Sequence, residues 1–361
     1  MRRVLKLARR TLNAYDARRA ARGEVEHIRA VTEPIIRQLQ SDGRRPLPQG
    51  ALSKADEYAR DVLGSLVYAA WLRVYTVLAG EFRVGWIPDN YYTKVVIPQI
   101  DYKYRLGSSR KTFIRRVLRS PNIPDCAYLL RRLFYDRNFQ RIDEGDLADV
   151  LFDEADTLVF KPDNSERGAQ VEIVTRATLD VDKCRQAKDG VFQSYVAQHP
   201  FFDEMTTGSA TTLRLTTALD QAGEVTVRAA YLRIARQSDG HVRSDSAIKV
   251  PVDLAAGTLV DTGYMPNWAK VDRHPDSGFV FAGRTIPDFR GATALVADLH
   301  RSFPHLSCIG WDICIDVEGV ARILEWNTYY NDIKFSEATT GPCFADMGWE
   351  QLWRSPLQGA S

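Results

Sequence analysis

The stretch that decides the fold covers residues 310–327 and reads Gly310-Trp-Asp-Ile-Cys-Ile-Asp-Val-Glu-Gly-Val-Ala-Arg-Ile-Leu-Glu-Trp-Asn327. Apolar and polar residues alternate on both sides of Glu318-Gly319, which is the pattern of a β-hairpin. A two-residue turn there, counted outward, places Asp312 directly opposite Glu325. Asn327 shares the face of Glu325, because side chains two residues apart in a strand point the same way. The hairpin therefore predicts three polar side chains on one face.

Two carboxylates that face each other across a strand pair repel, and a divalent cation between them removes that cost. Asp312, Glu325 and the amide of Asn327 are hard oxygen ligands of the kind that Mg²⁺ takes, with nucleotide phosphates completing its shell. The pattern predicts a magnesium–nucleotide site. The alternative is an exposed hairpin whose acids face water, and a bulge near the unfavoured Glu-Gly turn would shift the register by one residue. Apolar neighbours favour a packed sheet: Trp311, Ile313, Ile315, Ile323, Leu324 and Trp326.

Length and composition narrow the class of protein. The chain has 361 residues, enough for two or three packed subdomains, and its 45% hydrophobic and 26% charged residues are typical of a soluble globular protein. The balance of 48 basic and 46 acidic residues gives no reason to expect a nucleic acid as partner. Five scattered cysteines and the lack of a secretory signal favour the cytoplasm.

Charge is uneven at the start of the chain. Residues 1–23 carry eight Lys and Arg residues against a single acid, Asp16. A basic amphipathic helix of this kind fits an anionic membrane surface, which would make the protein peripheral at the inner membrane face. The alternative is a solvated helix that docks on its own protein. The sequence does not specify the oligomeric state.

The remaining pattern is helical at first and α+β from about residue 100 onward. We expect helices over residues 1–40, 51–84, 109–119 and 290–303, strands over 158–161, 171–176 and 191–196, and a long hairpin formed by 211–219 and 225–236. Residues 238–287 read as irregular.

Two further positions could carry chemistry. Lys161 leaves a buried strand and precedes a loop with Ser165 and Gly168, whose backbone N–H groups could approach phosphate oxygens closely. The alternative is a surface hairpin with an extended lysine. Arg214 shares a sheet face with Arg233 if the loop of the long hairpin has four residues, and two guanidinium groups could clamp phosphates or a developing oxyanion. The alternative is a pair of exposed strand arginines.

Together, Lys161-Pro with its small-residue loop, Thr-Leu-Arg214 and Asp312…Glu325-x-Asn327 resemble the ATP-grasp superfamily. Finer motifs look like its sugar-transfer-associated branch, and the resemblance covers about residues 100–335. These motifs are Gln198-His-Pro200, His274-Pro-Asp-Ser-Gly278, Gly283-Arg-Thr-Ile-Pro287 and Gly310-Trp-Asp312.

The resemblance implies an α+β, ATP-grasp fold, in which two α+β subdomains grip ATP. On this basis we expect a helical N-terminal region over residues 1–100, an N-terminal or lid subdomain over 101–195, a C-terminal subdomain with the metal site over 196–350, and a tail over 351–361. It also implies roles for single residues. Lys161 and Lys111 would contact the nucleotide phosphates, and the loop of Ser165 and Gly168 would cover them.

The strand Phe192–Val196 would lie beside adenine, with Gln193 as the polar contact and Tyr195 and Val196 next to it. Asp312, Glu325 and Asn327 would hold one or two Mg²⁺ ions, or Mn²⁺. Arg214 and Arg233 would act on the transferred phosphate or the substrate.

The sequence also departs from the family pattern. The common Asn-x-Pro-Gly after the glutamate is Asn327-Thr-Tyr-Tyr-Asn331-Asp here, and Gly310-Trp311 replaces the arginine often found before the first metal acid. The segment Arg243–Lys249 replaces an Asn/Gly-rich one. These changes concern the acceptor side more than ATP binding.

The function that the resemblance implies is an ATP- and Mg²⁺-dependent carboxylate–amine ligase, which forms an amide through an acylphosphate in surface polysaccharide assembly. Its partners would be a small-molecule carboxylate and amine, one of them sugar-linked. The alternatives are a kinase that phosphorylates a hydroxyl, and a non-catalytic nucleotide-binding scaffold of a glycan-assembly complex.

Overall fold

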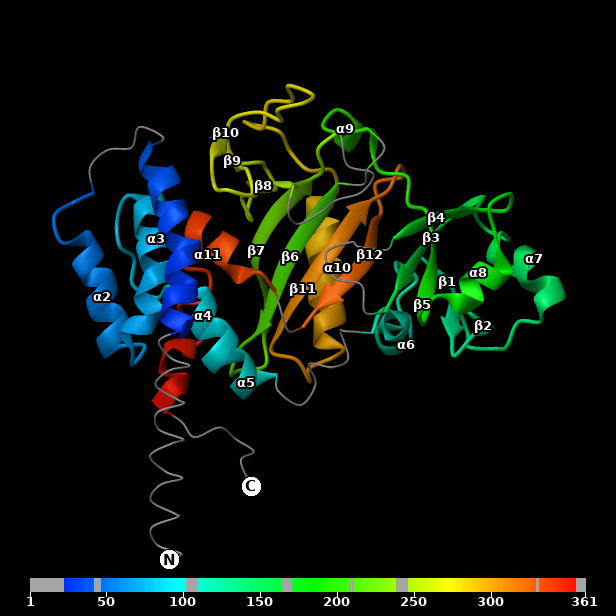
Figure 1. Ribbon diagram of the computed structural model, residues 1–361, viewed down its shortest axis with the longest axis horizontal. Coiled ribbons are helices and arrows are strands. Elements are labelled where there is room, and N and C mark those ends of the chain that lie inside the picture. Colours follow the sequence, from blue (N-terminus) through cyan, green and yellow to red (C-terminus); the bar gives the residue numbers. More distant parts are fainter. Residues whose placement is uncertain are drawn as a thin grey trace, which may run out of the picture.

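The computed structural model describes residues 23–41, 47–101, 110–163, 171–207, 209, 211–237, 246–328 and 331–354. Two antiparallel sheets lie side by side, and a helical region packs at the far end of the larger sheet (Figure 1). The expected α+β class is therefore confirmed. The basic segment 1–22 and the loop of Ser165 and Gly168 lie outside the described residues, so the predictions made for them stay predictions.

The smaller sheet has five strands in the order β2-β1-β5-β3-β4. Its strands alternate in burial because one face packs on short helices, as in the stretch that contains Leu158 and Phe160. The elements are β1 (Asp125–Leu130), β2 (Leu133–Asp136), α7 (Leu147–Leu151), β3 (Thr157–Pro162), β4 (Glu172–Thr175), α8 (Val181–Gln186) and β5 (Gly190–Ser194).

The larger sheet has seven strands in the order β10-β9-β8-β7-β6-β11-β12. Helix α10 packs on one of its faces through Phe289, Ala292 and Val296, and Trp311 and Trp326 complete that core. The opposite face carries the polar residues of interest. The elements are β6 (Thr212–Leu219), β7 (Val225–Ile234), β8 (Ile248–Pro251), β9 (Gly263–Tyr264), β10 (Lys270–Val271), α10 (Phe289–Arg301), β11 (Cys308–Ile315) and β12 (Ala321–Asn327).

The helical region shares a core with the larger sheet. Trp71 of this region stacks near Trp268, and the C-terminal helix α11 lies between the two parts with Phe335 against Tyr231 (Figure 1). The elements are a helix over residues 23–41, α2 (Ala51–Asp61), α3 (Ala69–Ala79), α4 (Asp89–Tyr91), a π-helical turn (Tyr92–Val96), α5 (Ile97–Ile100) and α11 (Ile333–Thr339).

Glu337 fixes this junction. The carboxylate is fully buried and accepts hydrogen bonds from the backbone N–H groups of Ile87 and Cys343, both at 2.7 Å. Burial raises the pKa of Glu337 to about 7, although these N–H groups act in the opposite direction. The connection between the helical region and α11 therefore depends on a carboxyl group that forms no ion pair with any cation in the described part of the chain.

Three predictions of secondary structure need correction. The single helix expected over residues 51–84 is broken where Gly64 has a φ of 80° and Ser65 caps the next turn. The helix over 109–119 is a 3₁₀ turn (Lys111–Phe113) followed by α6 (Ile114–Leu118). The region read as irregular contains β8, β9 and β10, which are too short to show an alternating pattern. No helix among the described ranges combines the length and apolarity that a membrane span requires.

Asp312 pairs with Glu325 as predicted, although the hairpin differs from the prediction in two places whose effects on the register cancel. The loop has three residues, because the N–H of Asp316 bonds the carbonyl of Val320, and Gly319 takes a left-handed φ of 79°. Leu324 then forms a bulge that restores the register. The β6–β7 hairpin likewise has a loop one residue longer than predicted, with five residues between the paired Leu219 and Val225. A bulge at Arg228 restores its register.

Both segments that connect the two sheets are hydrogen-bonded to the acidic hairpin. Before β1, the carbonyl of Asn122 accepts from the N–H of Ile323, at 2.9 Å. After β5, the N–H of His199 donates to the carbonyl of Ile315 at 2.9 Å, and the carbonyl of Ala197 accepts from Val317 at 3.1 Å. The hairpin is therefore attached to the smaller sheet on both of its strands.

Candidate functional site

Asp312 lies on β11, next to the edge strand of the larger sheet, opposite Glu325 of β12 on one side and Arg214 of β6 on the other. Arg214 donates from Nε to Oδ1 of Asp312 at 2.6 Å and from Nη2 to Oδ2 at 3.0 Å, which is a bidentate ion pair. Its Nη1 donates to the carbonyl of Asn331 at 3.2 Å. Three of the five guanidinium donors are therefore used within the protein, and both partners are buried.

Burial alone would raise the pKa of Asp312, but the neighbouring Arg214 and Arg233 outweigh it and lower the pKa. Arg233 Nη1 and Asn327 Nδ2 each reach Oδ2 of Asp312 at a longer 3.4 Å. Asp312 is thus an anion at neutral pH. Gly310 fits beside this pair because an added Cβ would lie 3.3 Å from Arg214 Nη1, which gives a structural reason for one departure from the family pattern.

Glu325 forms an ion pair with Lys111, whose Nζ lies 3.2 Å from Oε1. Lys111 is 7% exposed although it belongs to a short 3₁₀ turn. The turn is tied to the end of β3, because Asp163 accepts from the backbone N–H and the hydroxyl of Thr112, both at 3.0 Å. These hydrogen bonds hold Lys111, which precedes the smaller sheet in the chain, next to Lys161, which belongs to that sheet.

Lys161 faces the same group of charges. Its pKa is lowered chiefly by burial and by repulsion from Lys111, while Glu325 acts in the opposite direction. Among the residues that the structure describes, none forms a hydrogen bond or ion pair with the side chain of Lys161. Two lysines from different elements therefore converge on one carboxylate, and a bound polyanion would relieve the repulsion between them.

Gln193 lies in β5 and is 2% exposed. Its Nε2 donates to Oδ1 of Asp125 at 2.8 Å and to the carbonyl of Leu324 at 3.4 Å, while its Oε1 is buried without a hydrogen-bond partner. Burial raises the pKa of Asp125 to about 6. Because both contacts of Nε2 are acceptors, the amide orientation is fixed and Oε1 remains free to accept from a ligand.

The two other residues expected beside adenine lie beyond this strand. β5 ends at Ser194, two residues earlier than predicted, because the chain then turns into the connection to the larger sheet. Tyr195 is 42% exposed and Val196 is partly exposed. The structure brings together Lys111, Lys161, Gln193, Arg214, Arg233, Asp312, Glu325 and Asn327.

The group fits a nucleotide with a divalent cation. Lys111 and Lys161 offer cations, and the buried Oε1 of Gln193 offers an acceptor for an exocyclic amine. No three His, Cys, Asp or Glu side chains within the described ranges are grouped as a metal site. An ion here would therefore depend on phosphate oxygens besides Asp312, Glu325 and Asn327, which is the manner in which Mg²⁺ is usually bound.

Sequence reasoning missed three contributors. Asp125 orients Gln193, Asp163 anchors the turn of Lys111, and the carbonyl of Asn331 holds Arg214. Each acts through a residue at least 51 positions away in the sequence, so periodicity carries no sign of it. The position of Asp163 directly after Lys161-Pro was the one available signal.

Part of the chain matches a protein-family model. Residues 181–345 match the model of the sugar-transfer associated ATP-grasp family. The match, which covers 165 of the 361 residues, agrees with the resemblance of the sequence motifs to this branch. A search of curated protein sequences found no match.

Several solved structures are distantly similar. An ADP complex of N5-carboxyaminoimidazole ribonucleotide synthetase is 11% identical over 62% of this chain and 45% of that chain, with a TM-score of 0.38. The biotin carboxylase domain of the Hydrogenobacter thermophilus 2-oxoglutarate carboxylase, in complex with MgADP, ADP and bicarbonate, is 10% identical over 73% and 49%, with a TM-score of 0.43. The biotin carboxylase–ATP complex from Campylobacter jejuni is 8% identical over 91% and 70%, with a TM-score of 0.46. The chain spans about half the length of the first two.

Proposed function

We propose that the chain is an ATP- and Mg²⁺-dependent ligase that joins a small-molecule carboxylate to an amine. The observation that carries the proposal is the convergence of Lys111 and Lys161 on Glu325, directly beside the Asp312–Arg214 pair. The two lysines come from the part of the chain around the smaller sheet, and the acids come from the larger sheet. A triphosphate between them would be held from both sides.

Each residue has a distinct part in this proposal. Lys111 and Lys161 bind phosphate oxygens, and Gln193 accepts from the base. Asp312, Glu325 and Asn327 would hold Mg²⁺ (Mn²⁺ is an alternative), which when bound neutralises charge on the transferred phosphoryl group. Arg214 keeps Asp312 ionised and oriented. Arg233 has only one long contact to Asp312, so it is the better placed of the two arginines to meet a substrate.

The reaction proceeds in two balanced steps. A substrate carboxylate oxygen attacks the γ-phosphorus of ATP, the bond to the β-phosphate oxygen breaks, and ADP leaves. The amine then attacks the carbonyl carbon of the acylphosphate, inorganic phosphate leaves, and the amine loses a proton to form the amide. Exclusion of water from the cleft protects the acylphosphate from hydrolysis.

The family name supports a sugar-linked carboxylate or amine, and we propose a role in the assembly of surface polysaccharides in the cytoplasm. A screen of ADP release tests the reaction. Purified protein is incubated with ATP, Mg²⁺ and paired carboxylates and amines, including sugar acids and amino sugars, and products are identified by mass spectrometry. A ligase needs both partners and yields an amide. A stable phosphorylated product formed without an amine would identify a kinase instead.

The matched variants are Glu325→Gln and Glu318→Gln, which lie in the same hairpin. Glu325 faces the lysines, whereas Glu318 is exposed at the loop. We expect Glu325→Gln to lower turnover by about a hundredfold or more, because one ligand and one partner charge are lost. Glu318→Gln should match the wild type. Unchanged ATP consumption in Glu325→Gln would contradict the metal assignment.

A further inference from the structure

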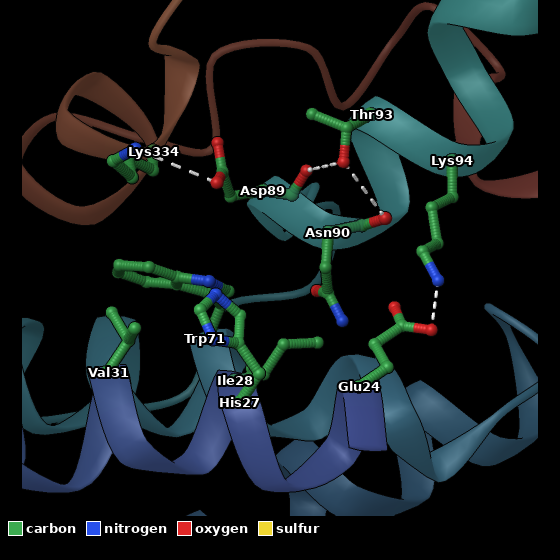
Figure 2. Close-up of a pocket in the computed structure, with 10 residues that line it drawn as sticks. All are labelled: Glu24, His27, Ile28, Val31, Trp71, Asp89, Asn90, Thr93, Lys94 and Lys334. Atoms are coloured by element: carbon green, nitrogen blue, oxygen red, sulfur yellow. Dashed lines mark hydrogen bonds and ion pairs between the residues drawn. The ribbon is translucent and has the colours of Figure 1, made fainter. Parts of the chain in front are cut away.

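A second cavity of about 570 Å³ lies within the helical region, between the helix over residues 23–41 and the segment that begins with α4 (Figure 2). Trp71 of α3 and Lys334 of α11 close its far side. This volume is in the range of sites that hold small molecules. The cavity is separate from the candidate nucleotide site, because none of its lining residues belongs to the group of residues described there.

Two acceptor oxygens at this cavity have no hydrogen-bond partner within the described residue ranges. Asn90 is 7% exposed and points toward the facing helix in Figure 2. Its Nδ2 donates to the carbonyl of Val67 at 3.0 Å, which fixes the amide orientation, and its buried Oδ1 has no hydrogen-bond partner. Oε1 of Glu24 is also buried and unpartnered. Buried acceptors of this kind are costly unless a donor meets them, so both oxygens indicate a ligand with donor groups.

The charges of the cavity balance one another. Glu24 forms an ion pair with Lys94 through its other oxygen, and Asp89 lies 3.6 Å from Lys334. Lys334 also pairs with Asp332 at 3.3 Å, so both lysines are already engaged by acids, and a ligand with a net charge would have to displace one of these ion pairs. An uncharged ligand that carries several hydroxyl groups meets the free acceptors without this cost.

Apart from His27 and Thr93, the remaining lining is apolar. Trp71 is 5% exposed, with Lys334 Nζ at 5.8 Å from its ring centroid, and Ile28 packs beside it. Val31 lines the same wall and is 43% exposed. A flat apolar wall opposite hydrogen-bonding groups suits a ring with one apolar face and a polar edge.

We propose that this cavity binds an uncharged sugar residue. Its hydroxyl groups would donate to Asn90 Oδ1 and Glu24 Oε1 and accept from the lysines, while the C–H face of the ring packs toward Trp71. The proposal stands independently of the ligase reaction, because it uses no residue of the nucleotide cleft. It assigns to the helical region a recognition role that its sequence did not reveal.

Saturation-transfer difference NMR on the full chain tests the proposal, with glucose, galactose, N-acetylglucosamine and maltose as probes. Glucosamine and glucuronate serve as charged counterparts. We expect saturation transfer to the ring protons of at least one neutral probe, and weaker transfer to its charged counterparts. Val31→Trp fills the cavity from an exposed position and should abolish the signal.

Glu24→Ala should raise the dissociation constant about tenfold, as expected for one hydrogen bond to a charged acceptor, and it keeps the test valid if Val31→Trp does not fold. Glu26→Ala, exposed on the same helix, and Lys161→Met, in the cleft, should leave binding unchanged. The proposal is overturned if no neutral probe receives saturation, if the charged probes bind better, if Val31→Trp or Glu24→Ala binds normally, or if Lys161→Met alone abolishes binding.

Discussion

Strand β11 of the larger sheet and the junction with the helical region each bury a carboxylate, yet the pKa values of the two acids are shifted in opposite directions. Asp312 meets Arg214 and Arg233, which lower its pKa against the effect of burial. Glu337 meets backbone N–H groups, and burial raises its pKa to about 7. Equal burial therefore gives a permanent anion at the candidate site and a proton-binding group at the junction, and the neighbouring cation decides which.

The largest expected loss of stability comes from removing Arg214, the cation that pairs with Asp312. Arg214→Leu leaves Asp312 buried beside one distant guanidinium and should lower the free energy of unfolding by about 3–5 kcal/mol. Chemical denaturation measures this loss. Arg273→Leu, which breaks an exposed pair with Asp272, should leave stability close to that of the wild type. Equal effects of the two substitutions would mean that the buried pair contributes no more than a surface pair.

The junction should respond to pH instead. The folded-state pKa of Glu337 lies above its ordinary value of 4.5, so its contribution to stability is complete below pH 4.5 and is lost as pH rises through about 7. Glu337→Gln cannot titrate. At pH 4.5 this variant should have a lower free energy of unfolding than the wild type. The difference between the two should become smaller by roughly 3 kcal/mol as pH rises from about 4.5 to about 8. Exposed Glu81→Gln serves as control, and parallel pH profiles for wild type and Glu337→Gln would refute the assignment.

Arg233 is the second cation next to Asp312. It has one contact of 3.4 Å to Asp312, against two shorter contacts from Arg214. Arg233→Leu should therefore cost only about 1–2 kcal/mol of stability, the scale of one charged hydrogen bond. If it acts on substrate as proposed, its turnover should fall much more than its stability. A stability loss equal to that of Arg214→Leu would place it in the same structural unit.

The smallest effect on stability is expected at Lys161, a partly buried cation whose side chain has no hydrogen-bond or ion-pair partner among the described residues. Lys161→Met should change the free energy of unfolding by less than about 1 kcal/mol, since the methylene stem is largely kept. ATP affinity, measured by titration calorimetry, should nevertheless fall about tenfold or more. Lys188→Met, an exposed lysine ahead of β5, is the control. Unchanged affinity in Lys161→Met would remove it from the site.

The sequence predicted the pairing of Asp312 with Glu325 and the shared face of Arg214 and Arg233, although both hairpin loops are one residue longer than assumed. In each hairpin a bulge compensates, because burial of the apolar set on one face selects the register that keeps it inside. Local counting cannot foresee the bulge, but the face on which residues end is set by packing. This is why the predicted faces are correct.

The sequence could not reveal which charges would pair. Arg214 and Asp312 are separated by 98 positions, and Lys111 meets Glu325 only because Asp163 clasps the turn of Lys111. Likewise, the break at Gly64 and the strands β8–β10 depend on tertiary contacts. Residues 1–40 were predicted as a helix, but no pattern in them indicated that Glu24 would line a cavity together with Asn90.

The attachment of the acidic hairpin to both connecting segments has a mechanical consequence. One segment bonds Ile323 on β12, and the other bonds Ile315 on β11, so a rotation of the smaller sheet pulls on both strands that carry the acids. Closure over a nucleotide would thus be transmitted directly to Asp312 and Glu325, without a separate relay. The contacts to the nucleotide and the coordination of the ion would then change together.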